Sequence, residues 1–423
     1  MPISEEELRY LISFIVLLLL SKKTYFRSKI YLFLYNVSSC TLLISIVNGF
    51  KQTMLFHSIV LINIAVLWLF TAKVQKYPQI GLFMNITFNL WFQYTMLDFS
   101  EGDPMQNIVG ILFMFTMRAT MLFDEFNGSF CDAFNYLYFV PSILTGPHPS
   151  FKEFLAGRKL NTPIKTDKVA AERENQKNSK EVFEGDEKNY SLLVSREDRQ
   201  IKFEKYMRIS LISLVCILIS NFFNFNQELL KSKSILMKMF FSHLQNIKVR
   251  MPFYFGWYWT SSCLAMHGHN IINVLVWETE TCDSLAEVCR TWNSVTSKFF
   301  KKYVFKPVVE ITRKKFLAAT ACFAISSLMH SYSLADLIFF VGGGLATYFF
   351  ERAHKILPLF RSSIFIRQLS CFIFFDFIVY IRIGPYLRNG LKYWENMQFC
   401  GLKYYLLLQT LLRCYFIIKS RQK

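Results

Sequence analysis

The first candidate for chemistry is a histidine at the end of an apolar stretch. Residues 316–329 carry no charge, and His330 follows them directly. An ionisable side chain inside a membrane helix is costly and is therefore a candidate for function. Ser326 and Ser333 share a helix face with His330, where one hydroxyl can fix the imidazole tautomer. A neutral imidazole in a low-dielectric site is a suitable general base for a hydroxyl proton.

A second element must accompany His330, because a lone histidine in a membrane helix also serves as a hydrogen-bond partner between helices. The segment R-T-W-N ends at Asn293, and a run from Lys298 to Lys306 then alternates aromatic rings with lysines. Such residues gather at the level of lipid headgroups, where they attract anionic ligands such as the phosphates of coenzyme A. A plain basic flank of a membrane helix has the same composition, and composition does not separate the two.

The other ionisable and thiol groups are weaker candidates. Arg118 lies within an apolar segment, where snorkelling or pairing between helices explains it. His267 and His269 form an H-x-H without a third ligand one turn later, so no metal site is predicted. The ten cysteines form no C-x-x-C pair. Cys282 and Cys289 lie in a polar segment and would pair only if it faced an oxidising lumen.

The elements that position these residues must be membrane helices. Of the 423 residues, 53% are hydrophobic and 45 are Phe, which is too apolar for a soluble domain. A spanning helix needs roughly 20 apolar residues, and the chain has about ten such stretches. They cover approximately residues 7–20, 29–49, 54–74, 79–97, 107–123, 133–145, 206–224, 253–276, 316–350, 362–383 and 400–418. We therefore predict one membrane-embedded domain over residues 1–423, an all-α, polytopic, multi-pass helical bundle.

Three segments need separate treatment. The polar insert 151–205 has almost no large apolar residues and is predicted to be a flexible loop. The basic, amphipathic segment 225–252 favours an interfacial helix. The apolar run 316–350 would be about 50 Å long as one helix, too long for an upright span, so a break is expected near Ser331 to Asp336. The net charge of the chain is +18, and its basic residues lie between apolar runs, as they do in the flanks of membrane helices. We therefore predict no nucleic-acid partner.

Three of these features together resemble the membrane-bound O-acyltransferase family. They are the W-N pair that ends at Asn293, the Y-V-F-K run that starts at Tyr303, and a helix that ends in His330. In that family an Asn and a His are the signature active-site residues, so the resemblance implies catalytic roles for Asn293 and His330. Asn293 would polarise a thioester carbonyl and His330 would accept the hydroxyl proton. Trp292, Tyr303 and Ser326 would support the site.

Four segments are similar to one branch of the family, the protein-serine O-palmitoleoyltransferases that lipidate Wnt proteins. They are Y-L-Y-F-V from Tyr136, S-L-A-E-V from Ser284, Y-V-F-K from Tyr303 and S-S-L-M-H from Ser326. This resemblance spans about residues 105–355 and implies a multi-pass protein of the endoplasmic reticulum membrane. Palmitoleoyl-CoA would be the acyl donor, a Wnt protein the acceptor, and no cofactor would be permanently bound. Where the family usually has Gly after the His, this chain has Ser331.

Two alternatives stay open. A lysophospholipid O-acyltransferase of the same family would use the same Asn and His on a different acceptor. A transporter or a lipid-binding protein without catalysis fits the composition but leaves the spacing of Asn293 and His330 unexplained.

Overall fold

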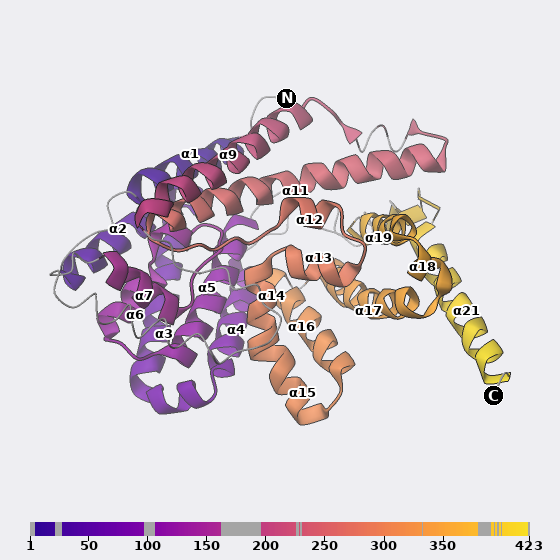
Figure 1. Cartoon of the computed structure of the whole chain (residues 1–423). Helices are drawn as coiled ribbons and strands as arrows, with labels where there is room; N and C mark the ends of the chain where they lie inside the picture. The colour runs from indigo at the N-terminus through magenta and orange to yellow at the C-terminus, as the bar shows by residue number, and fades with distance from the viewer. Residues whose placement is uncertain are drawn as a thin grey trace.

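The computed structural model describes residues 5–21, 28–96, 106–161, 196–225, 228, 231–331, 333–379, 391–392, 394–395, 397–398 and 400–421. Within these ranges the chain folds into helices, and an isolated antiparallel bridge joins Val274 and Trp292. The predicted all-α fold is confirmed. In Figure 1 the N-terminal helices gather on one side, the C-terminal helices on the other, and α14 to α16 lie between them.

The N-terminal half begins with α1 (Glu5–Ser21), α2 (Lys29–Asn48), α3 (Phe50–Lys76), α4 (Gln79–Met96) and α5 (Gln106–Glu125). Helix α5 is central, because it packs against α2, α3 and α4 and also against α16 of the C-terminal half. Phe56 of α3 and Phe115 of α5 meet edge to face at 5.4 Å within the largest buried apolar cluster. Helix α5 thus joins the N-terminal helices to the helix that carries His330.

The segment 133–145 does not form the predicted span. Helix α6 (Phe130–Leu137) ends early, a 3₁₀ turn η1 (Val140–Ser142) follows, and irregular backbone continues to Ser150. Pro141 lacks an amide hydrogen and cannot continue the helix. Arg118 of α5 instead donates to the carbonyl oxygens of Leu137 (3.2 Å) and Ser142, and to the Ser142 hydroxyl at 2.7 Å. Irregular backbone at membrane depth is tolerated where protein groups satisfy it, so Arg118 has a packing role.

The polar insert 151–205 is helical at both of its ends, which the sequence did not predict. Helix α7 (Phe151–Asn161) buries Phe151 and Phe154 against Tyr136, with ring distances of 5.3 and 5.5 Å. Its first turn is capped by Ser150 and Glu153, each of which accepts from the other's backbone N–H. The second helix, α9 (Arg196–Ser220), begins inside the predicted loop. The part of the predicted loop at 162–195 lies outside the described residues.

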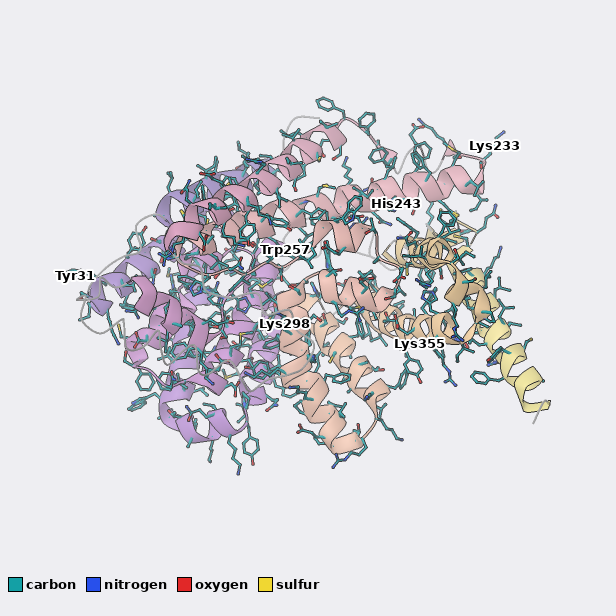
Figure 2. All side chains as sticks on the ribbon, viewed as in Figure 1. Tyr31, Lys233, His243, Trp257, Lys298 and Lys355 are labelled. Carbon is teal, nitrogen blue, oxygen red and sulfur yellow. The ribbon has the colours of Figure 1, made fainter. Side chains whose placement is uncertain are left out.

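Helices α9 and α11 (Ile235–Met266) form a hairpin. Helix α11 has 32 residues, which makes it about 48 Å long, and continues through Pro252. The sequence predicted an interfacial helix at 225–252 and a separate span from 253, but α11 joins most of both in one helix. That the first turns of α11 lie at the membrane interface stays a prediction. Figure 2 places Lys233, just before α11, at the edge of the molecule and Trp257 near the centre.

The C-terminal half consists of α12 (Val276–Glu280), α13 (Leu285–Thr291), α14 (Ser294–Phe300), a π-helical turn η2 (Lys301–Phe305), α15 (Lys306–Thr312), α16 (Lys315–His330), α17 (Leu334–Ile356), α18 (Pro358–Ser362), α19 (Ile364–Val379) and α21 (Cys400–Arg421). The predicted break in the run 316–350 is confirmed, because α16 ends at His330 and α17 starts four residues later. Gly344 lets α17 approach α16 closely, since a Cβ there would collide with the ring of Phe323.

Three described helices, α2, α3 and α17, are long and apolar enough to cross a membrane. Helix α16 and residues 364–373 are shorter apolar helices, so fewer helices qualify by length and composition than the sequence suggested. Large apolar side chains stay on the outside, among them Trp68, Leu69 and Phe70 of α3, each at least 48% exposed. An apolar outer surface of this kind belongs in a lipid environment and not in water.

Candidate active site

His330 is the last residue of α16, and two aromatic rings hold its imidazole. The ring of Phe340 in α17 stacks on it at 4.8 Å, and Phe113 of α5 packs against it at 4.9 Å. The turn beyond it is built by hydroxyls: Ser331 donates to the carboxylate of Asp336 and accepts from the backbone N–H of Ser333 at 3.0 Å. The Ser that replaces the usual family Gly therefore forms the turn between α16 and α17.

The turn that carries His330 is also clamped from α4. Asn89 Nδ2 donates to the carbonyl oxygen of Met329 at 2.8 Å, and Gln93 Nε2 donates to Asn89 Oδ1 at 3.2 Å. Carbonyls in the last turn of a helix have no partner within the helix, so this bond satisfies a group that would otherwise be unpaired. Asn89 and Met329 are both at most 1% exposed. This clamp holds the last turn of α16 against α4.

Asn293 adopts a left-handed backbone conformation (φ 51°, ψ 49°) at the residue before α14. Asparagine tolerates this conformation better than most residues. The hydroxyl of Thr296 donates to Asn293 Oδ1 at 2.7 Å, which fixes the carbonyl end of the side-chain amide. Among the described residues, no group accepts from the Asn293 NH₂. The half-buried amide therefore presents a hydrogen-bond donor to a ligand.

The start of α14 is capped by another asparagine. Asn273 is only 1% exposed. Its backbone carbonyl oxygen accepts from the backbone N–H of Ser294 at 2.8 Å. Its side-chain Oδ1 accepts from the backbone N–H of Val295 at 3.2 Å. Because Asn273 performs the capping, the Asn293 side chain is not needed for it. This division of work leaves Asn293 available for a different task.

Trp292 lies in an aromatic cluster on α11. Its ring packs edge to face on Trp257 at 4.8 Å, and on Phe253 and Tyr254 at 5.5 and 5.7 Å. The same face of α11 carries Arg250, which forms a two-pronged ion pair of 2.7 and 2.8 Å with Glu280. These contacts fix both ends of the segment 280–292, so Trp292 supports the backbone that presents Asn293.

Helix α5 brings the neighbourhoods of Asn293 and His330 together. Phe113 packs on the His330 ring, and Met117 Sδ lies 3.5 Å from the Thr296 hydroxyl that holds Asn293. Phe113 and Met117 are one turn apart on the same face of α5, a separation of about 6 Å along its axis. The two predicted residues therefore border neighbouring turns of one buried helix, from elements that are far apart in the sequence.

The remaining predicted support residues lie in the same buried region. Tyr303 packs its ring on Phe299 at 4.9 Å and donates its hydroxyl to Asp124 Oδ2 at 2.9 Å. It shares an apolar cluster with Phe113 and Met329. Ser326 is 9% exposed and lies one turn before His330 on α16. Tyr303 thus anchors η2 to α5, while a contact of Ser326 with the imidazole stays a prediction.

The basic aromatic run presents a charged outer face beside the site. Its four lysines are exposed: Lys298, Lys301, Lys302 and Lys306. Lys302 is ion-paired with Asp124 at 2.6 Å and Glu125 at 3.2 Å, so it serves to hold η2 in place. Lys298, labelled in Figure 2, starts this face only five residues after Asn293. The run thus combines an anchoring lysine with exposed ones.

Sequence reasoning missed the residues that position the site through distant contacts. Asn89 and Gln93 are two of these residues, and with Asn85, which pairs with Asn63 and not with the site, they recur every four residues in an otherwise apolar segment. This stripe of amides was the available signal. Asn273 had no such signal, because its capping role depends on the bridge between Val274 and Trp292.

Comparison with known proteins shows the family of the chain. The family model described as MBOAT, membrane-bound O-acyltransferase family, matches residues 51–391, a range that contains Asn89, Asn293 and His330. A search of the curated proteins found no match. The match covers well over half of the chain and includes every element that contacts the site. The chain therefore belongs to the membrane-bound O-acyltransferase family.

Proposed function

We propose that this chain transfers a palmitoleoyl group from palmitoleoyl-CoA to a serine hydroxyl of a Wnt protein, in the membrane of the endoplasmic reticulum. Family membership gives the coarser part of this statement, a membrane acyltransferase with an acyl-CoA donor. The observation that supports the proposal is that the donor amide of Asn293 and the imidazole of His330 both lie beside neighbouring turns of α5.

The reaction needs one base and one donor for developing negative charge. The serine oxygen attacks the thioester carbonyl carbon, and its proton passes to the neutral imidazole of His330. The Asn293 NH₂ donates to the carbonyl oxygen as charge develops on it. The carbon–sulfur bond then breaks, and His330 returns the proton to the departing thiolate of coenzyme A. One ester forms, one thioester is lost, and His330 ends neutral.

The surroundings suit these roles. Phe113 and Phe340 pack against two sides of the imidazole and exclude water from them. Lys298 and Lys301 are exposed close to Asn293 and would attract the phosphates of coenzyme A at the membrane surface. The thioester would then enter the apolar region from this side.

The choice of acceptor rests on segments that resemble Porcupine, the enzyme that acylates Wnt proteins. One of them, Y-L-Y-F-V from Tyr136, includes the end of α6 and the beginning of η1, which Arg118 holds against α5. Another, S-L-A-E-V from Ser284, starts the helix that leads to Asn293. One of these segments packs on α5 and the other begins the helix that leads to Asn293. Their resemblance to Porcupine supports a protein acceptor over a lysophospholipid.

The acceptor is tested in cells that lack this protein. Wnt serine acylation should vanish in them and return with the intact chain but not with Asn293→Ala, while lysophospholipid acylation by membranes stays unchanged. Asn85→Ala serves as the matched control, because it alters a buried asparagine that lies outside the site. If Wnt acylation persisted and lysophospholipid turnover fell instead, the lysophospholipid acyltransferase would replace this proposal.

A further inference from the structure

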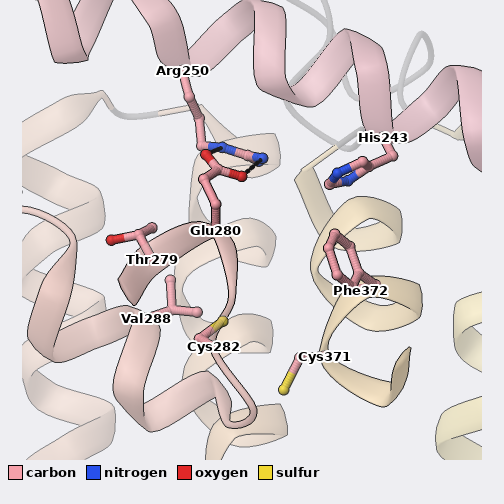
Figure 3. A pocket seen from close by; sticks show the side chains of 8 residues that line it. All are labelled: His243, Arg250, Thr279, Glu280, Cys282, Val288, Cys371 and Phe372. Atoms are coloured by element: carbon pink, nitrogen blue, oxygen red, sulfur yellow. Dashed lines mark hydrogen bonds and ion pairs between the residues drawn. The ribbon is translucent and has the colours of Figure 1, made fainter. Parts of the chain in front are cut away.

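A small cavity lies between α11, the turn that joins α12 to α13, and α19. Two cysteines from different elements line it, Cys282 of the turn and Cys371 of α19, together with Glu280 and His243. Figure 3 shows that each cysteine side chain extends toward the other's element. Neither residue belongs to the proposed active site, and both thiols are free.

The position of Cys282 is fixed by polar contacts on both sides of it. Arg367 of α19 binds the carboxylate of Asp283 with Nε and Nη2, both at 2.7 Å. The next residue of α19, Gln368, donates to the carbonyl oxygen of Thr281 at 2.8 Å. The turn is therefore pinned to α19 on both sides of Cys282. Cys371 follows these anchors by one helical turn and lines the same cavity as Cys282.

The two thiols differ in exposure. Cys371 is 2% exposed, whereas Cys282 is half-buried and open to the cavity. Interaction with the Cys371 thiol lowers the pKa of the Cys282 thiol. Thiolates attack disulfides, and the more exposed thiol of lower pKa attacks first. Cys289, the partner that the sequence suggested for Cys282, lies in α13 and is not among the residues that line this cavity.

We propose that Cys282 and Cys371 form a disulfide by exchange with a small disulfide such as oxidised glutathione. The Cys282 thiolate attacks one glutathione sulfur, a mixed disulfide forms, and one glutathione thiolate leaves. The Cys371 thiolate then attacks the Cys282 sulfur and releases the second glutathione. Two protein thiols are oxidised and one glutathione disulfide is reduced to two thiols. The bond ties the start of α13, which leads to Trp292 and Asn293, covalently to α19.

The test uses the purified full chain in detergent, incubated with oxidised glutathione, alkylated, digested without reduction and examined by mass spectrometry. We expect a peptide pair linked through Cys282 and Cys371. In Cys371→Ser the second step is blocked, so Cys282 should accumulate as its glutathione mixed disulfide. Cys289→Ser is the matched control and should keep the cross-link.

Two results would overturn the proposal. One is complete alkylation of both Cys282 and Cys371 in the intact chain after oxidation, while the exposed Cys414 is oxidised in the same sample. The other is a cross-link from Cys282 to Cys289. The measurement on the intact chain does not depend on whether any variant folds, and it requires no assay of acyl transfer.

Discussion

The clamp from α4 to the end of α16 predicts that Asn89→Leu lowers the rate of acyl transfer. The change keeps a similar side-chain volume but removes the donor that lies 2.8 Å from the Met329 carbonyl. Leaving a buried carbonyl unpaired costs about 1–3 kcal/mol. This cost destabilises the conformation in which His330 is positioned for catalysis. Each ~1.4 kcal/mol changes a rate about tenfold, so we expect kcat to drop about 5- to 150-fold. The acyl-CoA KM should change little.

Asn85→Leu is the control, because it separates positioning from stability. Asn85 lies one turn earlier on the same helix, is 2% exposed, and exchanges two hydrogen bonds of 2.8 and 2.9 Å with Asn63. Its loss should lower the melting temperature at least as much as the loss of Asn89, yet leave kcat per folded molecule near the parental value. Equal loss of kcat in both variants, or an unchanged kcat in Asn89→Leu, would refute the reasoning.

Two further predictions concern the scaffold, and thermal unfolding in detergent measures both. Gly344→Ala should destabilise the α16–α17 hairpin by about 1–3 kcal/mol, because the new Cβ meets the ring of Phe323. A Cβ at Gly343 meets open space, so Gly343→Ala should instead stabilise α17 by about 0.5–1 kcal/mol. A Gly343→Ala variant that melts below the Gly344→Ala variant would contradict the packing. Arg118→Leu removes three hydrogen bonds to Leu137 and Ser142 and should cost at least about 3 kcal/mol, more than Arg118→Lys, which keeps a donor.

The parts of the fold that follow from local composition were predictable. The apolar run 316–350 is too long for one span and contains Ser331, Ser333 and Asp336, which favour turns and caps over helix interiors. The helix break between His330 and Leu334 therefore follows from length and side-chain chemistry. His330 was recognisable as a candidate in the same way. The free-energy cost of an ionisable group in a membrane helix depends on its apolar neighbours, and these are visible in the sequence.

The segment 133–145 shows where local reasoning fails. Its composition is apolar enough for a span, but the helix does not continue through Pro141, and Arg118, in a different helix, supplies donors to the irregular backbone that follows. No pattern within the segment reveals that partner. The contact of Asn89 with Met329 and the shared cavity of Cys282 and Cys371 are equally long-range, and both depend on how helices pack after the chain has folded. Positioning residues of this kind become visible only in three dimensions.

The most direct test of the central claim measures acyl transfer by the purified His330→Ala variant. Labelled palmitoleoyl-CoA and a Wnt serine peptide are the substrates, and binding of the acyl-CoA and the melting temperature are recorded in parallel. Loss of a general base costs about 10²- to 10⁴-fold in rate, so we expect transfer to fall by at least 100-fold while donor binding and melting stay close to parental. Transfer by the folded variant at close to the parental rate would contradict the assignment of His330 as the base.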